Sequence, residues 1–340
     1  MSPEVISMPS LSVVIPVFNQ PQLIGRTIEH VTVAIERSGF SRTEIVVVVA
    51  DEPTRDALAQ LRPRLPLRVL DEEERGRFAA RRQGVEAATG ELVLLLDSRV
   101  SISPDALRFV SERIPSEDDL PIWTAHIEFD TSTAYGRFWD VIIPLVWWRY
   151  YSKPRTTSFG LDEYDRFTKA TTCFMAPRSM LLRANSEFSS HYSDTRYASD
   201  DTGLIRLLAA HQPINISPHF ACVHTPYKGY RAFMRNVREK GTTFPDSYGR
   251  PGTRFFPLLL AFYPACLLAA AVARLRPRLA LQAAMALPVC LAAATMAFRR
   301  NRADAIAVAW IGPNWLAGMC IGLWNGLWMA LRTRLQHGRR

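Results

Sequence analysis

The carboxyl-terminal part of the chain constrains the fold most, because it contains three apolar runs that are each long enough to cross a hydrocarbon core. These runs are residues 255–273, 279–298 and 305–331. Pro264, Pro288 and Pro313 lie inside them, and transmembrane helices tolerate proline, which indicates a kink. We therefore expect residues 254–340 to form a membrane region with two or three transmembrane helices.

The distribution of charge supports this division. Of the 41 basic and 32 acidic residues, 11 arginines and a single acid, Asp304, lie from Arg254 onward, so this tail carries +10 and the preceding residues about −1. Basic clusters beside apolar runs suit anionic headgroups, so the basic pI indicates a membrane anchor and no nucleic-acid partner. Every connection between the runs is basic, which leaves open whether all three cross or one is re-entrant.

The amino-terminal residues lack the basic and apolar regions of an export signal. Residues 1–253 are therefore expected to form a cytosolic domain, in a multi-pass protein of the cell membrane. The five cysteines have no paired spacing, and three of them lie in the apolar tail. We interpret them as reduced, small, buried hydrophobic residues.

Strand-like and helix-like segments alternate along the first domain. Aliphatic runs typical of buried strands occupy residues 11–17, 44–49, 67–70 and 91–96. Apolar residues at helical spacing occupy residues 22–38, 56–61, 76–88 and 201–210. This alternation predicts an α/β fold with a mostly parallel sheet that is covered on both faces.

The region between Pro121 and Ser190 has a looser pattern, with an aromatic-rich stretch from Tyr135 to Tyr151. Tryptophan and tyrosine suit a surface that is apolar on one side and wet on the other. The stretch is therefore part of the core, an acceptor groove, or a helix at the membrane surface.

Acidic residues stand where such a sheet binds its ligands. Asp51 follows the second strand, Asp97 follows the fourth, and Asp200 and Asp201 open a helix. Because the ligand crevice of an open α/β sheet lies at the carboxyl ends of its strands, we expect Asp51 and Asp97 to point into it. The alternative for each acid is a capping or solvated carboxylate, and Asp200 and Asp201 suit an amino-terminal helix cap.

Five short motifs follow one another between residues 11 and 210. They are SVVIPVFN from Ser12, EIVVVVAD ending at Asp51, GRFAARRQG with ATGE between Gly76 and Glu91, DSR from Asp97, and SDD ending at Asp201. In order and spacing they resemble the motifs of the family 2 inverting glycosyltransferases, whose domain is called GT-A. The resemblance implies a nucleotide-sugar-binding domain.

The resemblance also assigns roles to single residues. Asp201 falls at the position of the catalytic base, with Asp200 beside it. A carboxylate suits this role, since an acceptor hydroxyl must lose its proton as it attacks the anomeric carbon. The residues at donor-binding positions are Pro16, Phe18, Asn19, Asp51, Arg81, Asp97 and Arg99.

The chain departs from the family motifs at three places. Only the second aspartate of the base-binding pair is present, as Asp51, and Arg82 replaces an asparagine. Arg99 replaces the second acid of the Asp-x-Asp motif, which in the family holds Mg²⁺ or Mn²⁺ with the donor diphosphate. A guanidinium does not ligate a cation but binds a diphosphate bidentately, which leaves Asp97 as the one expected metal ligand and puts metal dependence in doubt. Alternatively, Arg99 pairs with a surface acid.

Two further features leave alternatives open. The histidines show no zinc-ligand spacing. His224 either lines the donor site or packs in a loop. The basic stretch from Lys228 to Lys240 either faces the phosphates of a lipid acceptor or bilayer, or is an ordinary solvated helix.

The sequence thus predicts an inverting glycosyltransferase that moves a sugar from a nucleoside diphosphate sugar to a lipid-linked or membrane-proximal glycan acceptor. The alternative is a degenerate family member that binds a nucleotide sugar or a partner without turnover. The change at Arg99 allows this alternative, and the retention of Asp51, Asp97 and Asp201 argues against it. A polymerising synthase would need more spans and a Gln-x-x-Arg-Trp motif, which the sequence lacks.

Overall fold

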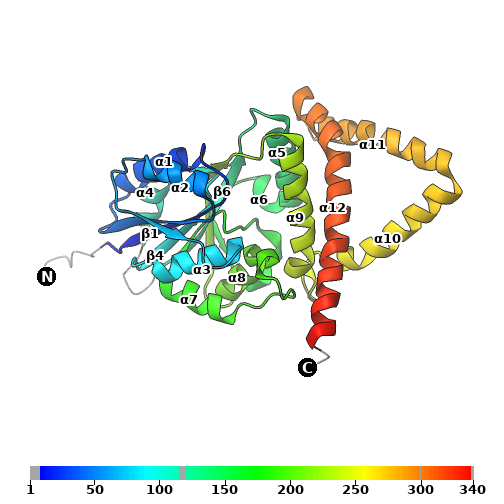
Figure 1. Cartoon of the computed structure of the whole chain (residues 1–340). Coiled ribbons are helices and arrows are strands. Elements are labelled where there is room, and N and C mark those ends of the chain that lie inside the picture. Colours follow the sequence, from blue (N-terminus) through cyan, green and yellow to red (C-terminus); the bar gives the residue numbers. More distant parts are fainter. Residues whose placement is uncertain (1–7, 115–119, 299, 338–340) are drawn as a thin grey trace. The chain divides into compact units, whose positions relative to one another are not determined.

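A computed structural model describes residues 8–114, 120–298 and 300–337 of the chain (Figure 1). The chain forms two compact units. The sheet unit comprises the residues up to Glu128, Arg149–Ser189 and Asp194–Thr225. The helical unit comprises Phe129–Trp148, Ser190–Ser193 and the residues from Pro226 onward. Each unit therefore combines segments that are far apart in the sequence.

The first strands of the sheet unit are parallel, and helices connect them. In chain order the elements are β1 Leu11–Val17, α1 Ile24–Glu36, β2 Thr43–Val49, α2 Glu52–Ala59, β3 Leu67–Asp71, α3 Arg77–Ala87 and β4 Leu92–Leu96. β1 pairs with β2 and β4, and β2 pairs with β3. β1 and β4 are buried at every position, as in strands that lie between two helical layers. The predicted α/β fold is confirmed.

Helix α2 begins at Glu52, earlier than the predicted start at Asp56. Asp51 caps this helix, because its carboxylate accepts a hydrogen bond from the backbone N–H of Thr54. Pro53 lies in the first turn of the helix. A backbone N–H at this position has no acceptor within the helix, so proline loses no helical hydrogen bond there. The apolar spacing that began at Asp56 therefore marked only the second part of the helix.

The remaining strands extend the sheet beyond β4. The pairs β4–β8, β6–β8, β5–β9 and β7–β9 are antiparallel. They are β5 Val100–Ile102, β6 Ile122–Phe129, β7 Thr157–Phe159, β8 Cys173–Pro177 and β9 Ile214–His224. Within the described residues the nine-stranded sheet has the order β3-β2-β1-β4-β8-β6-β9-β5, and β7 pairs with β9. β8 lies antiparallel to β4, with Cys173 opposite Leu96. The residues just before β8 consequently lie beside the carboxyl end of β4.

Helices cover both faces of this sheet (Figure 1). Helices α1, α2 and α4 (Ala106–Ser111) pack on one face, and α3, α7 (Arg178–Glu187) and α8 (Asp200–Ala209) pack on the other. Alternate residues of β1 enter the two cores, since Val13 and Ile15 belong to the first cluster and Val14 to the second.

The helical unit is built from α5 Ala134–Val146, α9 Tyr230–Tyr248, α10 Phe256–Leu275, α11 Pro277–Ala297 and α12 Arg302–His337. Its core forms where α5, α9 and α12 meet, around Phe138, Phe233 and Ile311. The first part of the aromatic-rich stretch therefore supplies core packing. Short helical turns occur in the connections of the chain: α6 Trp148–Tyr151, η1 Leu161–Arg166 and η2 Thr195–Tyr197.

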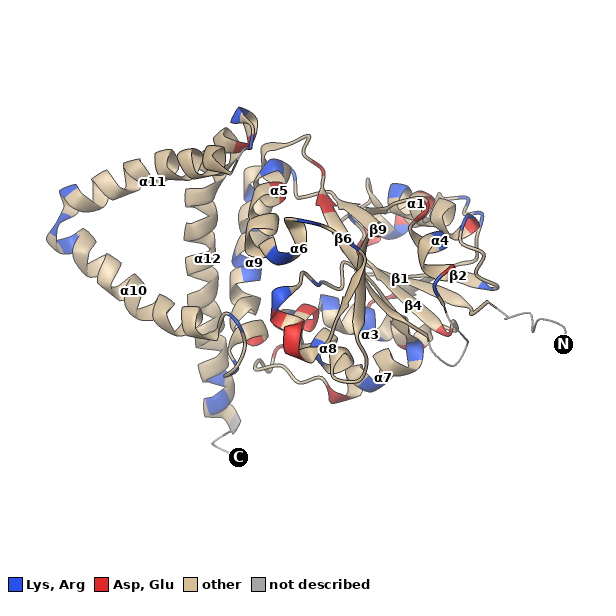
Figure 2. Cartoon of the chain, turned by 180° about the vertical axis from the view of Figure 1, so that it is seen from behind, with Lys and Arg blue, Asp and Glu red and all other residues tan. Residues whose placement is uncertain are grey.

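Helices α10, α11 and α12 are long and apolar enough to cross a membrane, which matches the three predicted runs and indicates a membrane protein. Charged residues are nearly absent from α10 and α11 except where the two helices meet (Figure 2). The most apolar stretch of α12 is 39% buried, against 6% for each of the other two. Helix α12 therefore differs from its neighbours in how much of it contacts protein.

A glycine of α3 lets this helix lie close on β1. A Cβ at Gly84 would lie 2.3 Å from Cγ1 of Val14, a buried β-branched side chain that has little freedom to turn aside. We expect Gly84→Ala to lower the free energy of unfolding by about 1–3 kcal/mol, because overpacking outweighs the better helix propensity of alanine. Gly160→Ala is the control, since nothing lies within 4 Å of its added Cβ. Equal unfolding midpoints of the two purified variants would contradict this account.

Candidate active site

Asp51 joins the carboxyl end of β1 to the start of α2. Its Oδ1 accepts hydrogen bonds from the backbone N–H of Thr54, at 3.0 Å, and from the Thr54 hydroxyl, at 2.8 Å. Its Oδ2 accepts from the backbone N–H of Asn19, at 2.6 Å. Both oxygens of the carboxylate thus fix the local backbone. Asp51 therefore follows the strand end, as predicted, and also caps a helix, which was the alternative.

The turn after β1 presents an aromatic ring. Asn19 has a φ of 52°, a left-handed conformation that asparagine tolerates better than most residues. Phe18, just before it, is 66% exposed, whereas Pro16 is buried inside β1 opposite Val48. An exposed ring beside Asp51 offers an apolar face at the ligand-binding edge of the sheet.

Arg81 of α3 connects three of the predicted acids. Its side chain is 5% exposed; Nη2 lies 2.6 Å from Oδ1 of Asp97, and Nη1 lies 2.6 Å from Oδ2 of Asp200. Nη1 also lies 3.9 Å from Oδ1 of Asp201. The structure therefore brings together four residues that the sequence places in three separate motifs.

The charges of this cluster shift the pKa values of its members. Burial alone would lower the pKa of Arg81, but Asp200, Asp97 and Asp201 raise it, so the guanidinium stays charged. Burial would raise the pKa of Asp97, but Arg81 and Arg77 lower it to about 2. Asp97 is consequently ionised at neutral pH.

Asp200 and Asp201 are neighbours in the chain with opposite pKa shifts. The side chain of Asp200 is 6% exposed, and burial raises its pKa despite the attraction of Arg81. The side chain of Asp201 is 44% exposed. Burial opposes ionisation, yet Arg81 and the Thr171 hydroxyl lower the pKa of Asp201. Asp201 is thus an ionised carboxylate that solvent reaches.

Thr171 orients Asp201. Its backbone N–H, at 3.1 Å, and its hydroxyl both donate to Oδ1 of Asp201. Thr171 lies just before β8, and the carbonyl of Thr172 accepts from the N–H of Asp97. Ser199, not an aspartate, occupies the cap position of α8. The two acids therefore lie in the first turn, where the helix dipole also favours negative charge.

Arg99 lies at the other side of Asp97, between β4 and β5. Its Nε and Nη2 donate to the backbone carbonyl of Thr225, at 2.9 and 2.7 Å, and the N–H of Thr225 donates to the carbonyl of Arg99. These bonds extend the β5–β9 pair, in which Val100 lies opposite His224. His224 contributes to the lowered pKa of Asp97, which places it near this strand end.

The donor set at this strand end does not fit a metal ion held by the protein alone. Asp97 is followed by Ser98 and Arg99, and its Oδ1 already accepts from Arg81. In the part of the chain that the structure describes, no group of three or more His, Cys, Asp or Glu side chains could hold a metal ion. A hard divalent cation needs more oxygen ligands than one carboxylate.

Sequence reasoning missed two residues of the site, Thr171 and Arg77. Thr171 lies in the loosely patterned region, and the only signal was a pair of threonines before the buried run of β8. Arg77 lowers the pKa values of Asp97 and Asp201, and it opens α3 one turn before Arg81. Spacing on one helix could have indicated it.

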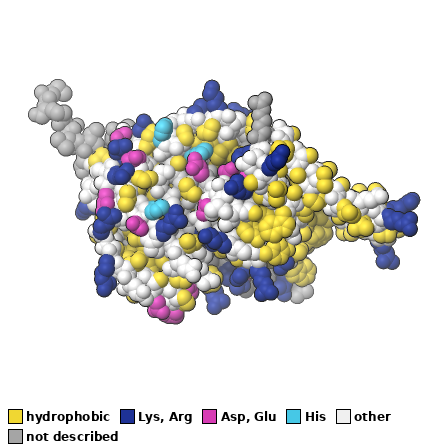
Figure 3. All heavy atoms as spheres, turned by 90° about the horizontal axis from the view of Figure 1, so that it is seen from above, with side chains coloured by type: hydrophobic (Ala, Val, Ile, Leu, Met, Phe, Trp, Pro, Cys, Tyr) yellow, Lys and Arg dark blue, Asp and Glu magenta, His cyan; other side chains and the backbone are white. Residues whose placement is uncertain are grey.

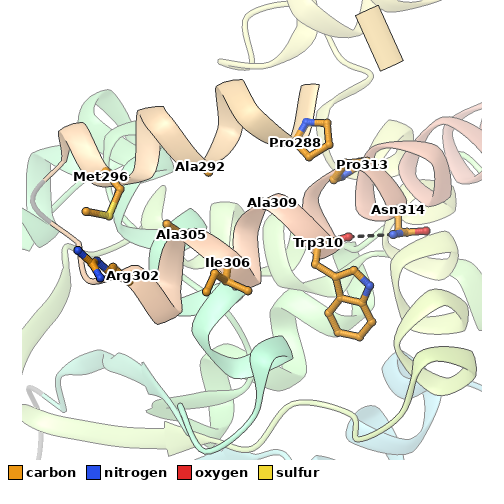
Figure 4. Close-up of a pocket in the computed structure, with 10 residues that line it drawn as sticks. All are labelled: Pro288, Ala292, Met296, Arg302, Ala305, Ile306, Ala309, Trp310, Pro313 and Asn314. Carbon is orange, nitrogen blue, oxygen red and sulfur yellow. Dashed lines mark hydrogen bonds between the residues drawn. The ribbon is translucent and has the colours of Figure 1, made fainter. Parts of the chain in front are cut away.

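A groove of about 780 Å³ lies in the helical unit, between α11 and α12 (Figure 4). Ala292, Ala305 and Ala309 line its middle, and Arg302 lies at one end. None of its lining residues is acidic. The groove therefore has no group that could take a proton from an acceptor, and it is not the candidate active site.

The sequence model of Glycosyl transferase family 2 matches residues 12–183, which are half of the chain. Among curated proteins, the "Succinoglycan biosynthesis protein ExoO" of Rhizobium meliloti (strain 1021) is 34% identical over 116 residues. These residues are 33% of this chain and 31% of that protein, so the chain matches less than a third of its relative's length.

Solved structures share the fold. The mannosyltransferase PcManGT from Pyrobaculum calidifontis, in complex with GDP-Man and Mn²⁺, superposes with a TM-score of 0.53 at 17% identity, over 94% of this chain and 88% of that one. S. aureus TarS 1–349 in complex with UDP-GlcNAc gives a TM-score of 0.47 at 16% identity, over 96% and 92% of the two chains. The first comparison shows a GT-A-like architecture.

The buried pairs of Arg81 make it a strong determinant of stability. We expect Arg81→Met to lower the free energy of unfolding by about 3–5 kcal/mol, because it leaves the carboxylates of Asp97 and Asp200, which are 20% and 6% exposed, without their partner. Arg82→Met is the matched control: Arg82 is 38% exposed and pairs with Glu74 at the surface. Its loss should change stability by about 0–1 kcal/mol. Unfolding transitions that coincide for the two variants would show that the Arg81 pairs contribute little.

Proposed function

Because the chain belongs to glycosyl transferase family 2, we propose that it is an inverting enzyme, which moves a sugar from a nucleoside diphosphate sugar to a lipid-linked or membrane-proximal acceptor. The observation that carries this proposal is Asp201: an ionised carboxylate, 44% exposed, whose Oδ1 is fixed by Thr171. Such a group is ready to accept a proton.

The proposed reaction is a single displacement. The acceptor hydroxyl oxygen attacks the anomeric carbon, the new glycosidic bond forms as the bond to the diphosphate oxygen breaks, and Oδ2 of Asp201 takes the hydroxyl proton. The nucleoside diphosphate leaves with the bonding electron pair. Asp200 is a positioning residue, because it contacts Arg81 and not solvent.

The donor is proposed to bind along the carboxyl ends of β1, β2 and β4. The exposed ring of Phe18 and the turn at Asn19 would contact the nucleoside, with Asp51 holding this turn in place and Pro16 fixing the strand before it. Asp97 and Arg81 form the floor beside the sugar and diphosphate. PcManGT binds GDP-Man, which agrees with a nucleotide-sugar donor.

The acceptor and location rest on the apolar helices. Three helices could cross a membrane, so we propose that the enzyme is anchored there with its sheet unit facing the cytosol. A lipid-linked acceptor at the cytosolic surface would be within reach of an enzyme anchored there. ExoO is named for succinoglycan biosynthesis, which agrees with a glycan product. The charge split gives no support to a nucleic-acid partner.

The runner-up is a member that binds a nucleotide sugar or a partner without turnover. Arg99 in place of the second Asp-x-Asp acid favours it. The exposure and lowered pKa of Asp201 oppose it, since binding alone does not require an accessible base. Measured sugar transfer separates the two functions.

Asp201→Asn tests the base. The amide keeps the size of the carboxylate but does not accept the proton, so we expect the transfer rate to fall by a factor of about 10² to 10⁴. Binding of the donor, identified as the nucleotide sugar that raises the melting temperature, should change little. Asp194→Asn is the control, because the carboxylate of Asp194 pairs with the neighbouring surface residue Arg196. A second variant, Asp200→Asn, shows whether the buried neighbour affects the transfer rate through the stability of the fold. Transfer at the wild-type rate by Asp201→Asn would remove Asp201 from the mechanism.

The pH dependence of Asp201 follows from its lowered pKa. The carboxylate is ionised above its pKa, so protonation of Asp201 should not lower the transfer rate between neutral pH and pH 5. The rate should fall only as the pH nears the lowered pKa of Asp201.

Chelation and Arg99→Ala together test the role of metal. We propose that Arg99, held by the carbonyl of Thr225, supplies fixed positive charge to the departing diphosphate. Arg99→Ala should then lower the rate by a factor of about 10² to 10³, whereas a chelator should leave much of the wild-type activity. Loss of all transfer with chelator, combined with an active Arg99→Ala variant, would assign this role to a divalent ion near Asp97.

A further inference from the structure

Helices α9 and α12 of the helical unit lie in backbone contact. A Cβ at Gly322 of α12 would lie 2.3 Å from the carbonyl oxygen of Arg238, and one at Gly326 would lie 2.5 Å from that of Thr242. Gly241 of α9 faces the same contact, since its Cβ would lie 2.9 Å from Cα of Gly322. Small residues of this kind allow close helix packing and fix the register of the two helices.

The face of α9 that flanks this contact is charged. Arg231, Arg235 and Arg238 are exposed at successive turns, and in the part of the chain that the structure describes their guanidinium groups make no hydrogen bond or ion pair. Phe233 and Val237, between them, are buried in the core of the unit. The packing of α9 against α12 therefore places a row of solvated arginines alongside α12.

This row lies level with the middle of the apolar run of α12. The uncharged stretch of the helix is residues 305–331, and every span of about 20 residues within it contains residues 312–324. Gly318 and Gly322 lie in that shared part, against Val237 and Arg238 of α9. If α12 crossed the bilayer, α9 would bring its arginines to the hydrocarbon centre, where each charge is strongly unfavourable.

Among the described residues, no charged helix like α9 packs along most of the length of α10 or α11. Their apolar side chains are exposed, and in the space-filling view they cover an arm that ends in basic side chains (Figure 3). A single residue, Arg276, connects the two helices. The two helices are therefore joined tightly as one hairpin.

The exposed face of α12 suits the membrane interface. Trp310, Trp324 and Trp328 are 55%, 38% and 59% exposed and lie on one side of the helix, away from its glycines. Tryptophan favours the level of the lipid headgroups, and arginine favours their phosphates. We propose that α12, paired with α9, lies at the surface of the bilayer among phospholipid headgroups and does not cross it, while the α10–α11 hairpin is the inserted element.

This proposal fixes the side on which the chain ends, and it is independent of the sugar and the acceptor. Two crossings by the hairpin, or none, return the chain to the side of its amino-terminal end. With α12 at the surface, the carboxyl end stays on that same side. A crossing α12 would place the two ends on opposite sides.

Reporter fusions to the full chain in a bacterial inner membrane test this directly. Green fluorescent protein should fluoresce, and alkaline phosphatase should stay inactive, at both the amino-terminal end and after residue 340. As a control, one added transmembrane helix between residue 340 and the reporter should reverse both signals. Active phosphatase at the unmodified carboxyl end, with inactive phosphatase at the amino-terminal end, would overturn the proposal, whereas active phosphatase at both ends would contradict only the cytosolic orientation proposed above.

A second pair of variants tests the helix contact on which the argument depends. Gly322→Leu should lower the melting temperature of the detergent-purified protein, because no space exists beside Arg238. Ala317→Leu, on the exposed face of α12, should leave it unchanged. Equal melting temperatures for the two variants would show that α9 does not hold α12, and the proposal would fail.

Discussion

The ion pairs of Arg81 unite parts of the sheet unit that are remote in the sequence: α3, the carboxyl end of β4 and the start of α8. A guanidinium that is 5% exposed needs partners, since an isolated buried charge is strongly unfavourable. Asp97 and Asp200 meet this need, and Gly84, on the next turn of α3, lets the helix approach β1 closely enough to place Arg81 there. The geometry of the candidate active site is thus a consequence of a packing contact.

This arrangement divides two adjacent aspartates into different roles. Both lie near Arg81, yet Asp200 is enclosed with it while Asp201 is turned toward solvent and held by Thr171. Burial disfavours the charge on Asp200, and the hydrogen bonds and nearby arginines favour the charge on Asp201. A base that must exchange protons with an acceptor needs the second environment. In the proposed mechanism, the buried Asp200 keeps the arginine in place while Asp201 accepts the proton.

The sequence predicted the parts of this site that depend on parallel strands. Because such strands end at one edge of the sheet, Asp51 and Asp97 could be placed from spacing alone. The contact of Thr171 with Asp201 could not, because it depends on β8, an antiparallel strand in a region without clear periodicity. The contact of Arg99 with Thr225 depends likewise on β9, which pairs across a long sequence separation. Local patterns carry no information on such pairings.

The same limit applies to the membrane region, where length and hydropathy gave three equivalent runs. Hydropathy describes one helix at a time, whereas the environment of a helix also depends on what is packed against it. The glycines of α12 bring a charged helix within backbone distance, and this contact changes the free energy of insertion of α12 without changing its own composition. Helices α10 and α11, which lack such a partner along most of their length, keep the behaviour that their composition predicts. A helix's apolar residues therefore indicate insertion only together with its tertiary contacts.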